Sequence, residues 1–135
     1  MDCLFCKIIQ KEIPAQIIYE DEKTLAFLDI RPINPGHTLV IPKEHAATIL
    51  EASSHAARAV IDTVKKITPA ILAATGALAF NIGINSGVIA GQVIHHYHLH
   101  IMPRFVGDGR DLWHAENASS EDLTQLAQKI RQQNI

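Results

Sequence analysis

Three histidines that alternate with apolar residues are the part of this chain best suited to chemistry. His96, His98 and His100 would share one face of an extended strand, about 6.5–7 Å apart, because alternate side chains of a strand project to the same side. Tyr97 and Leu99 would then point the other way, into a core. Protonated imidazoles this close repel one another, which lowers their pKa values and favours at least one neutral, nucleophilic ring at physiological pH.

The spacing of these histidines is compatible with three interpretations. One is imidazole catalysis, and another is a hydrolytic metal centre, since three histidines are a known ligand set of catalytic zinc. The third is a solvated polar face without function, which the scarcity of histidine in proteins disfavours. His95 would point away from His96, and we assign it no role.

Two further features would suit a phosphate-containing ligand. Residues 85–92 lie between two expected strands, where a loop with Asn85, Gly91 and Gln92 can present backbone N–H groups and side-chain amides to an oxyanion. Asp29 ends an apolar strand and could accept hydrogen bonds from vicinal hydroxyls. Taken alone, the loop is typical of an ordinary connection and Asp29 of a turn residue.

Length and composition indicate one compact globular domain over residues 1–135. The 47% of hydrophobic and 19% of charged residues are typical of a folded chain, and the length suits a single core. A formal net charge of −2 offers no general attraction to a polyanion. We therefore expect no binding of extended nucleic acid, whereas a small nucleotide remains possible.

Neither a signal peptide nor a membrane span is expected. The N-terminus has no basic segment followed by an apolar stretch, and no run approaches the ~20 apolar residues of a spanning helix. We therefore expect a cytoplasmic location and no membrane partner. Cys3 and Cys6 are too few and too close together for a secreted disulfide framework, which favours metal ligation or redox chemistry.

The elements that must position these residues predict an α+β fold with mostly antiparallel pairing. Helical spacing of apolar residues predicts a helix that starts at Ser53 or Ser54, is kinked or divided at Pro69 and stops at Gly76. A second, capped helix is expected after Ser119. Strands are expected over residues 17–19, 24–28, 37–41, 79–84 and 97–101, the first two forming a hairpin and the third stopping at Pro42.

Residues 96–102 also fit the pattern His-φ-His-φ-His-φ-φ, where φ is apolar, and on this motif the chain resembles the nucleoside phosphoramidase branch of the histidine triad family. The resemblance extends from Cys3 to Arg104. It implies a five-stranded, mostly antiparallel sheet with a main helix and a C-terminal helix. It also implies a homodimer in which the sheet continues into that of the partner. The matching segments are residues 3–9, 12–15, 26–30, 36–45 and 85–92.

The resemblance further implies a nucleotidyl hydrolase or transferase. His98 would attack the α-phosphorus and form a covalent nucleotidyl-histidine, and His100 would contact the phosphate and assist the leaving group. His96 would orient the site, and His37 would complete it. Substrates would be purine nucleoside phosphoramidates or related dinucleoside polyphosphates, with no metal at the reacting phosphate. A nucleotide-binding regulatory or scaffold protein with vestigial turnover is the alternative.

The family pattern also supplies residues that would bind the nucleotide. Asp29 would bind the ribose hydroxyls. Asn85 and Gln92, with Gly91 in the same loop, would hold the phosphate and the leaving group. The apolar slot for the base would be lined by Leu4, Phe5, Ile8, Phe27 and Ile30.

Two features depart from the phosphoramidase branch. Val93 stands where that branch has a serine or threonine hydroxyl near the phosphate, so one donor to the leaving group would be missing. After Arg104 the pattern is lost, and residues 113–135 form a variable C-terminal segment that begins with Trp113 and His114.

Cys3 and Cys6 form a C-x₂-C pair, which falls two ligands short of the four of a structural zinc site. In many bacterial members of the family the set is completed by a histidine after a Pro-Lys segment and by the first histidine of the triad. Those positions match His45 and His96. The resemblance therefore implies a structural Cys₂His₂ zinc site that pins the N-terminus to the sheet and orients the segment that carries His98.

Overall fold

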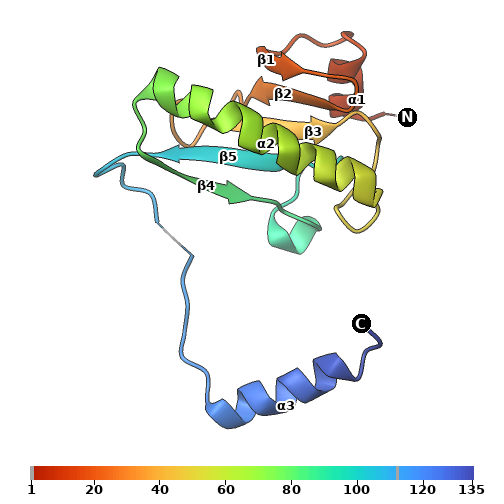
Figure 1. Ribbon diagram of the computed structural model, residues 1–135, viewed down its shortest axis with the longest axis vertical. Coiled ribbons are helices and arrows are strands. Elements are labelled where there is room, and N and C mark those ends of the chain that lie inside the picture. The colour runs from red at the N-terminus through yellow and green to blue at the C-terminus, as the bar shows by residue number, and fades with distance from the viewer. Residues whose placement is uncertain (1, 112) are drawn as a thin grey trace.

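The computed structural model describes residues 2–111 and 113–135. The strands form one sheet in the order β1-β2-β3-β5-β4, with every neighbouring pair antiparallel. This architecture confirms the predicted α+β fold with a main helix and a C-terminal helix (Figure 1). The elements in chain order are α1 (Leu4–Ile9), β1 (Ile17–Glu20), β2 (Thr24–Leu28), β3 (Thr38–Pro42), α2 (Ser54–Thr75), β4 (Ala79–Gly83), the 3₁₀ turn η1 (Val88–Ala90), β5 (Leu99–Arg104) and α3 (Ser120–Arg131).

Helix α2 begins and ends where the sequence predicts. The Ser53 hydroxyl accepts a hydrogen bond from the Ala56 N–H, and Gly76 takes the left-handed conformation that ends many helices, with φ at 76°. The expectation that Pro69 divides the helix is wrong, because α2 runs unbroken through it. Pro69 and Lys65 lie on the exposed face, so the carbonyl that loses its helical donor faces water.

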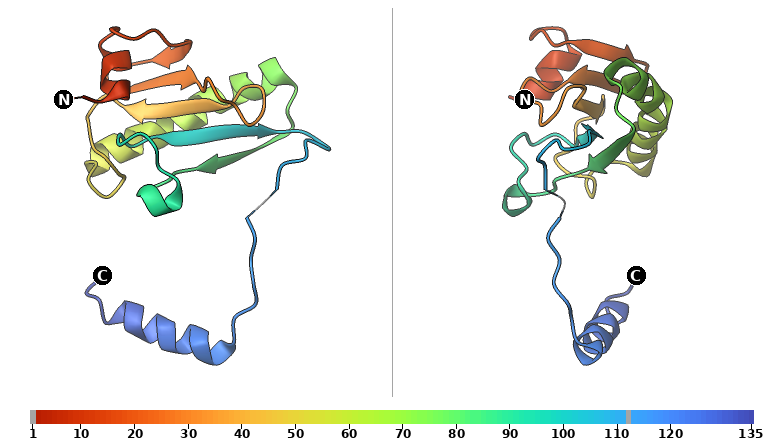
Figure 2. Two further views of the ribbon diagram at one scale, coloured as in Figure 1. Left: turned by 180° about the vertical axis from the view of Figure 1, so that it is seen from behind. Right: turned by 90° about the vertical axis from the view of Figure 1, so that its left-hand side faces the viewer.

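The sheet has a core on each face, because β2 and β3 are buried on both sides. Helix α2 covers one face along its length, as the two views of Figure 2 show. On the opposite face, the short helix α1, which the sequence analysis did not predict, packs Phe5 and Ile8 against β2 and β3. The α2-side core consists of Ala26, Val40, Val60, Val64, Ile67, Ile71, Tyr97, Leu99 and Ile101.

Strand β5 starts later and runs further than predicted, over Leu99–Arg104. His96 and His98 lie in the segment that leads into it, which bends over residues 94–96. Pro103, which has no N–H, fits into β5 because its nitrogen and carbonyl face the side on which β3 has already ended. On that side the carbonyl accepts a hydrogen bond from the Asn34 side chain. No strand on that side requires the missing N–H.

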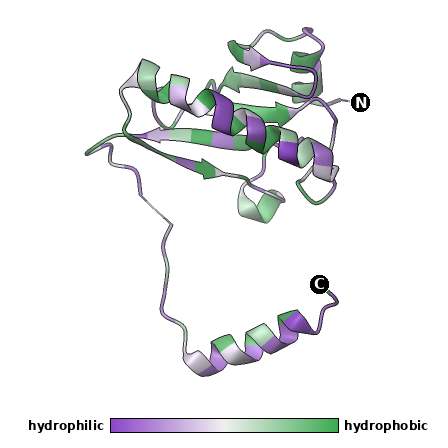
Figure 3. Ribbon diagram, in the orientation of Figure 1, coloured by the Kyte–Doolittle hydropathy of each residue, from purple (hydrophilic) through white to green (hydrophobic). Residues whose placement is uncertain are grey.

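Helix α3 forms where a capped terminal helix was predicted, and the Ser119 hydroxyl accepts a hydrogen bond from the Asp122 N–H. It lies beyond the β4 edge and clear of the sheet (Figures 1 and 2). Its apolar residues Leu123, Leu126 and Ile130 are exposed among polar neighbours (Figure 3). In the part of the chain that the structure describes, no helix has the length and apolar character needed to cross a membrane.

Candidate active site and metal centre

Three of the four histidines predicted to be catalytic meet at the start of β5. His98 and His100 come from β5 and the segment before it, and their ring centroids lie 5.0 Å apart. His37 precedes β3, the neighbour of β5, and its Nε2 lies 2.9 Å from His100 Nδ1. His96 faces a separate cluster with Cys3, Cys6 and His45. The alternating histidines therefore separate into two sites rather than forming one metal centre.

Hydrogen bonds assign a proton to one nitrogen of each ring. His98 Nδ1 lies 2.7 Å from the His96 carbonyl oxygen, which can only accept, so Nδ1 carries the proton and Nε2 keeps a free lone pair. The Ile33 N–H donates to His37 Nδ1 over 3.1 Å, so the His37 proton is on Nε2 and is donated to His100 Nδ1. His100 then carries its own proton on Nε2. This geometry leaves one ring with a lone pair beside another with a proton to donate.

The three rings are held neutral mainly by burial. Loss of solvation lowers the pKa of His37, His98 and His100, because the charged imidazolium is disfavoured in the interior. The pKa of His100 falls to about 4, since the like charges of His98 and His37 add to burial and outweigh the opposing effect of Asp29. The sequence analysis expected lowered pKa values from mutual repulsion, and the structure makes desolvation the larger cause.

Asp29 lies next to this group at the end of β2. Its Oδ2 is 3.6 Å from His37 Nε2, and its Oδ1 accepts a hydrogen bond from the Arg31 N–H. Asp29, His37 and His100 could offer three ligand atoms to a cation. However, the 2.9 Å between His37 Nε2 and His100 Nδ1 is a hydrogen-bond distance, shorter than the roughly 3.3 Å that separates two nitrogen ligands of a tetrahedral zinc.

The residues predicted to form the base slot differ in exposure. Phe5 presents its ring edge-on to His98, with centroids 5.2 Å apart, and packs at 5.4 Å against Phe27. Phe5, Phe27 and Ile8 are all buried in the core on that face, whereas Leu4 is 41% and Ile30 is 93% exposed. Leu4 and Ile30 are therefore the members of the predicted slot with free apolar surface.

The loop over residues 85–92 is braced by its own side chains. Gln92 is 3% exposed, and its amide donates to the carbonyls of Ala47 and Ile94 while its oxygen accepts from the Gly87 N–H. The predicted contact of Gln92 with phosphate would require these bonds to break. Gly91 has φ at 91°, and a side chain there would crowd the Asn85 amide at 3.3 Å. Val93 is 81% exposed.

The second cluster has the chemistry and spacing of a zinc site. Cys3 Sγ lies 3.5 Å and Cys6 Sγ 3.7 Å from His96 Nδ1, while His45 Nδ1 lies 3.3 Å from Cys6 Sγ and 3.2 Å from His96 Nδ1. A tetrahedral zinc, with bonds of about 2.3 Å to sulfur and about 2.0 Å to nitrogen, separates sulfur and nitrogen ligands by roughly 3.5 Å and two nitrogens by roughly 3.3 Å. The four residues therefore fit the ion.

The protonation of these groups also suits a cation. His96 Nε2 lies 2.8 Å from the Pro42 carbonyl and so carries the proton, which leaves the Nδ1 lone pair directed at the cysteines. Burial, together with the neighbouring Cys3, raises the pKa of Cys6 to about 11. A metal ion would overcome this effect by binding the thiolate. The start of α1 places Cys3 and Cys6 together, since the Cys6 N–H donates to Cys3 Sγ.

The sequence analysis missed some groups that act on this site. The Ile33 N–H, which assigns the His37 proton, is a backbone group and leaves no side-chain signal. Asn34, the next residue, was also missed, because an asparagine in a loop with two prolines is typical of a turn. Helix α1 has six residues, too few to show a clear helical period.

The sequence pattern of the HIT domain matches residues 10–107. The chain belongs to the HIT family. It is 40% identical over 135 residues to the adenosine 5′-monophosphoramidase hnt1 of Schizosaccharomyces pombe, covering 96% of each chain. It is 43% identical over 122 residues to the adenylylsulfatase HINT3 of Arabidopsis thaliana, covering 90% of this chain and 61% of that one.

Solved structures of HIT proteins share the fold. SMU.412c from Streptococcus mutans superposes with a TM-score of 0.92 at 43% identity, over 97% of this chain and 84% of that one. A Zn-bound histidine triad family protein from Mycobacterium smegmatis gives a TM-score of 0.77 at 36% identity, over 96% and 98% of the two chains.

Proposed function

We propose that this HIT protein is a hydrolase that cleaves the bond between the α-phosphorus of a purine nucleotide and its leaving group. The observation that carries the proposal is the His98 ring, whose Nδ1 proton is donated to the His96 carbonyl so that Nε2 keeps a lone pair beside His100. The hydrolase names of the yeast and plant relatives support the same reaction class.

In the proposed reaction, His98 Nε2 attacks the α-phosphorus as the bond to the leaving group breaks. His100 donates a hydrogen bond from Nε2 to the leaving group, and His37 Nε2–H supports His100 through its Nδ1. The leaving amine takes its proton from a solvent water. The hydroxide that remains attacks the phosphorus of the nucleotidyl-histidine, the phosphorus–nitrogen bond to His98 breaks, and a nucleoside monophosphate leaves while His98 Nε2 regains its lone pair.

Other side chains of this site would bind and orient the nucleotide. Asp29 would accept hydrogen bonds from the ribose hydroxyls, and the Asn85 amide and the backbone around Gly91 would face the phosphate. Leu4 and Ile30 would offer apolar surface to the base.

A nucleotide-binding regulator with little turnover is the second candidate. Two observations favour it: Val93 supplies no hydroxyl near the leaving group, and the Gln92 amide is fully engaged within its own loop. Tight binding of a nucleotide without any covalent adduct would support this candidate over the hydrolase.

We also propose that Cys3, Cys6, His45 and His96 hold a structural zinc. The fit of their distances to a tetrahedral ion and the Zn-bound mycobacterial relative support this site. When bound, the zinc would supply no chemistry to the reaction. It would cross-link the start of α1 to the segment before β5, and so hold the His96 carbonyl that fixes the His98 proton.

A second copy of the chain is the proposed partner at the β4 edge. Among the residues that the structure describes, β4 has a neighbouring strand on one side only, and Phe80 and Ile82 on it are partly exposed. An isolated helix of twelve residues is only marginally stable in water. Helix α3 nevertheless lies clear of the sheet and exposes an apolar stripe, which a partner could cover. The superposition on SMU.412c covers nearly the whole chain, so a crystallised relative holds this helix in a similar place. These features favour a homodimer in which the sheets join and α3 packs on the partner.

The test of the function is turnover of an adenosine 5′-phosphoramidate of a primary amine. Wild-type protein should release AMP, and His98→Ala should abolish release. His95→Ala is the matched control, because His95 is an exposed neighbouring histidine outside the site. Equal turnover by wild type and His98→Ala would reject the mechanism.

A further inference from the structure

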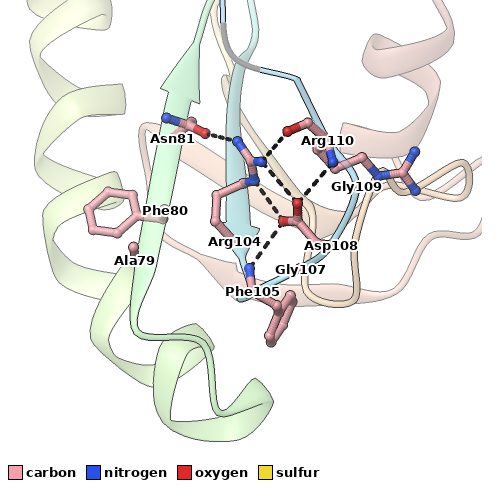
Figure 4. Close-up of a pocket in the computed structure, with 9 residues that line it drawn as sticks. All are labelled: Ala79, Phe80, Asn81, Arg104, Phe105, Gly107, Asp108, Gly109 and Arg110. Atoms are coloured by element: carbon pink, nitrogen blue, oxygen red, sulfur yellow. Dashed lines mark hydrogen bonds and ion pairs between the residues drawn. The ribbon is translucent and has the colours of Figure 1, made fainter.

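Just after β5, one buried carboxylate collects an unusual number of hydrogen bonds. Asp108 receives a bidentate pair from Arg104, at 2.8 Å and 3.0 Å, and also bonds from the N–H groups of Phe105 and Arg110. Its side chain is 8% exposed, and Arg104, through its hydrogen bonds, holds the pKa of this carboxyl well below its usual range. Asp108 and Arg104 line a pocket of about 500 Å³. Figure 4 shows Arg104 between Asp108 and Asn81, with a further hydrogen bond from Arg104 to the Asn81 side chain.

A fifth bond connects this carboxylate to the loop before β3. The Asn34 side-chain amide donates one hydrogen to Asp108 Oδ2 at 2.9 Å and the other to the Pro103 carbonyl at 2.9 Å. Asn34 is itself buried. Both amide hydrogens of Asn34 are therefore committed to the end of β5 and the turn after it.

The same loop holds the His37 ring. The His37 N–H donates to the Asn34 carbonyl at 3.1 Å, and the Ile33 N–H donates to His37 Nδ1. His37 Nε2 in turn donates to His100 Nδ1. A continuous series of hydrogen bonds therefore runs from Asp108 through Asn34 and the loop backbone to His37 and His100.

We propose that Asp108 and Asn34 are positioning residues for the histidine pair His37 and His100. They fix the loop whose Ile33 N–H holds the His37 proton on Nε2, and hence the His100 proton on the nitrogen that faces the leaving group. Asp108 lies one residue beyond the segment matched by the HIT domain, whereas Asn34 lies within it. The inference rests on the proposed hydrolase function.

The proposal predicts a loss in kcat rather than in KM. When the loop loosens, His37 can turn so that it no longer donates to His100 Nδ1, and the His100 proton can then move from Nε2 to Nδ1. Misplacement of a catalytic group in this way lowers the rate by about tenfold or more. The apolar surface of Leu4 and the Phe5 ring belong to α1, which the clamp does not contact. Asp29 and Ile30 adjoin the loop but directly follow β2, so the KM for the nucleotide should change by a smaller factor than kcat.

Two variants test the clamp from its two ends. Asn34→Ala removes the connection and leaves the Arg104–Asp108 ion pair intact. Asp108→Asn keeps the size of the side chain but replaces one oxygen by an NH₂ group, which then faces donors only, because all five partners of this carboxylate are donors. Arg110→Ala is the matched control, because Arg110 enters the cluster only through its backbone N–H and carbonyl.

The readouts are kcat, KM and the ¹⁵N chemical shifts of the imidazole rings, recorded on folded protein at neutral pH. In wild type and Arg110→Ala, His100 should show a protonated Nε2 and an unprotonated Nδ1. In Asn34→Ala and Asp108→Asn, His100 should show a mixture of tautomers, with kcat lowered about tenfold. The ¹⁵N shifts need no turnover, so they test the clamp even if the protein hydrolyses no phosphoramidate.

Wild-type kcat and wild-type His100 shifts in either variant would overturn the proposal. So would a fall in kcat with unchanged His100 and His37 shifts, because the residues would then act on stability or on another step.

Discussion

Replacement of His100 by asparagine should change how the stability of this protein depends on pH. His100 faces His98, His37 and Asp29, and its pKa falls to about 4, mainly through burial, from an ordinary value of 6.5. Because the folded pKa is below the unfolded one, the unfolded chain binds the proton first as the pH falls. The stability tied to the neutral ring is therefore complete above about pH 6.5 and is lost between about pH 6.5 and pH 4.

The size of this loss follows from the two pKa values. Proton linkage predicts that His100 alone removes about 2 kcal/mol from the free energy of unfolding between pH 7 and pH 5, and about 3 kcal/mol by pH 4. His100→Asn removes the titrating group, while its side-chain oxygen can still accept the hydrogen bond from His37 Nε2. The variant should therefore lose about 2 kcal/mol less than wild type between pH 7 and pH 5.

Urea unfolding followed by circular dichroism at pH 7, 6 and 5 measures the difference. Both proteins retain the cysteine–histidine cluster, so its own pH dependence cancels. His95→Asn is the control, because His95 is exposed and its replacement should leave the pH dependence unchanged. The reasoning is refuted if wild type and His100→Asn lose the same free energy between pH 7 and pH 5.

Three further predictions concern the metal, the core and the partner. The Cys3→Ser/Cys6→Ser variant should bind no zinc, whereas metal analysis of wild type should give about one zinc per chain; full retention by the variant would exclude the site. Leu99→Ala should lower the free energy of unfolding by about 3 kcal/mol in a urea titration, since Leu99 is buried in the α2-side core; a loss below about 1 kcal/mol would contradict this packing. Leu126→Asp should turn a dimer into a monomer in analytical ultracentrifugation, and unchanged sedimentation would remove α3 from the proposed contact.

The elements with local signals could be predicted from the sequence. Ser53 and Gly76 bound α2, and the short apolar runs of β2 and β3 follow from side chains that pack on both faces of the sheet. Helix α1 could not be predicted in this way, because six residues show no clear period and its position depends on packing against β2 and β3.

The start of β5 illustrates a tertiary effect. Alternation extends the expected strand back to residue 97, but the Tyr97 N–H donates to the Ala46 carbonyl and the His96 ring donates to the Pro42 carbonyl. These bonds, to the last residue of β3 and to the segment after it, replace the regular ladder. No local sequence signal reports such partners.

The candidate site was only partly accessible from the sequence. The motif places His98 and His100 together, and the resemblance pairs Cys3 and Cys6 with two distant histidines. The positions of protons depend on backbone partners such as the His96 carbonyl and the Ile33 N–H, which require the fold. For Gln92 the sequence predicted a contact with the ligand, whereas in the fold its amide is buried and donates hydrogen bonds to the carbonyls of Ala47 and Ile94.

The most direct test of the proposed function is a rapid-quench experiment with an adenosine 5′-phosphoramidate, followed by mass spectrometry of the proteolysed protein. The account predicts an adenylyl group on the peptide that contains His98, formed and lost at rates consistent with turnover, and absent from His98→Ala. Turnover without an adduct on that peptide, or an adduct that persists in His98→Ala, would contradict it.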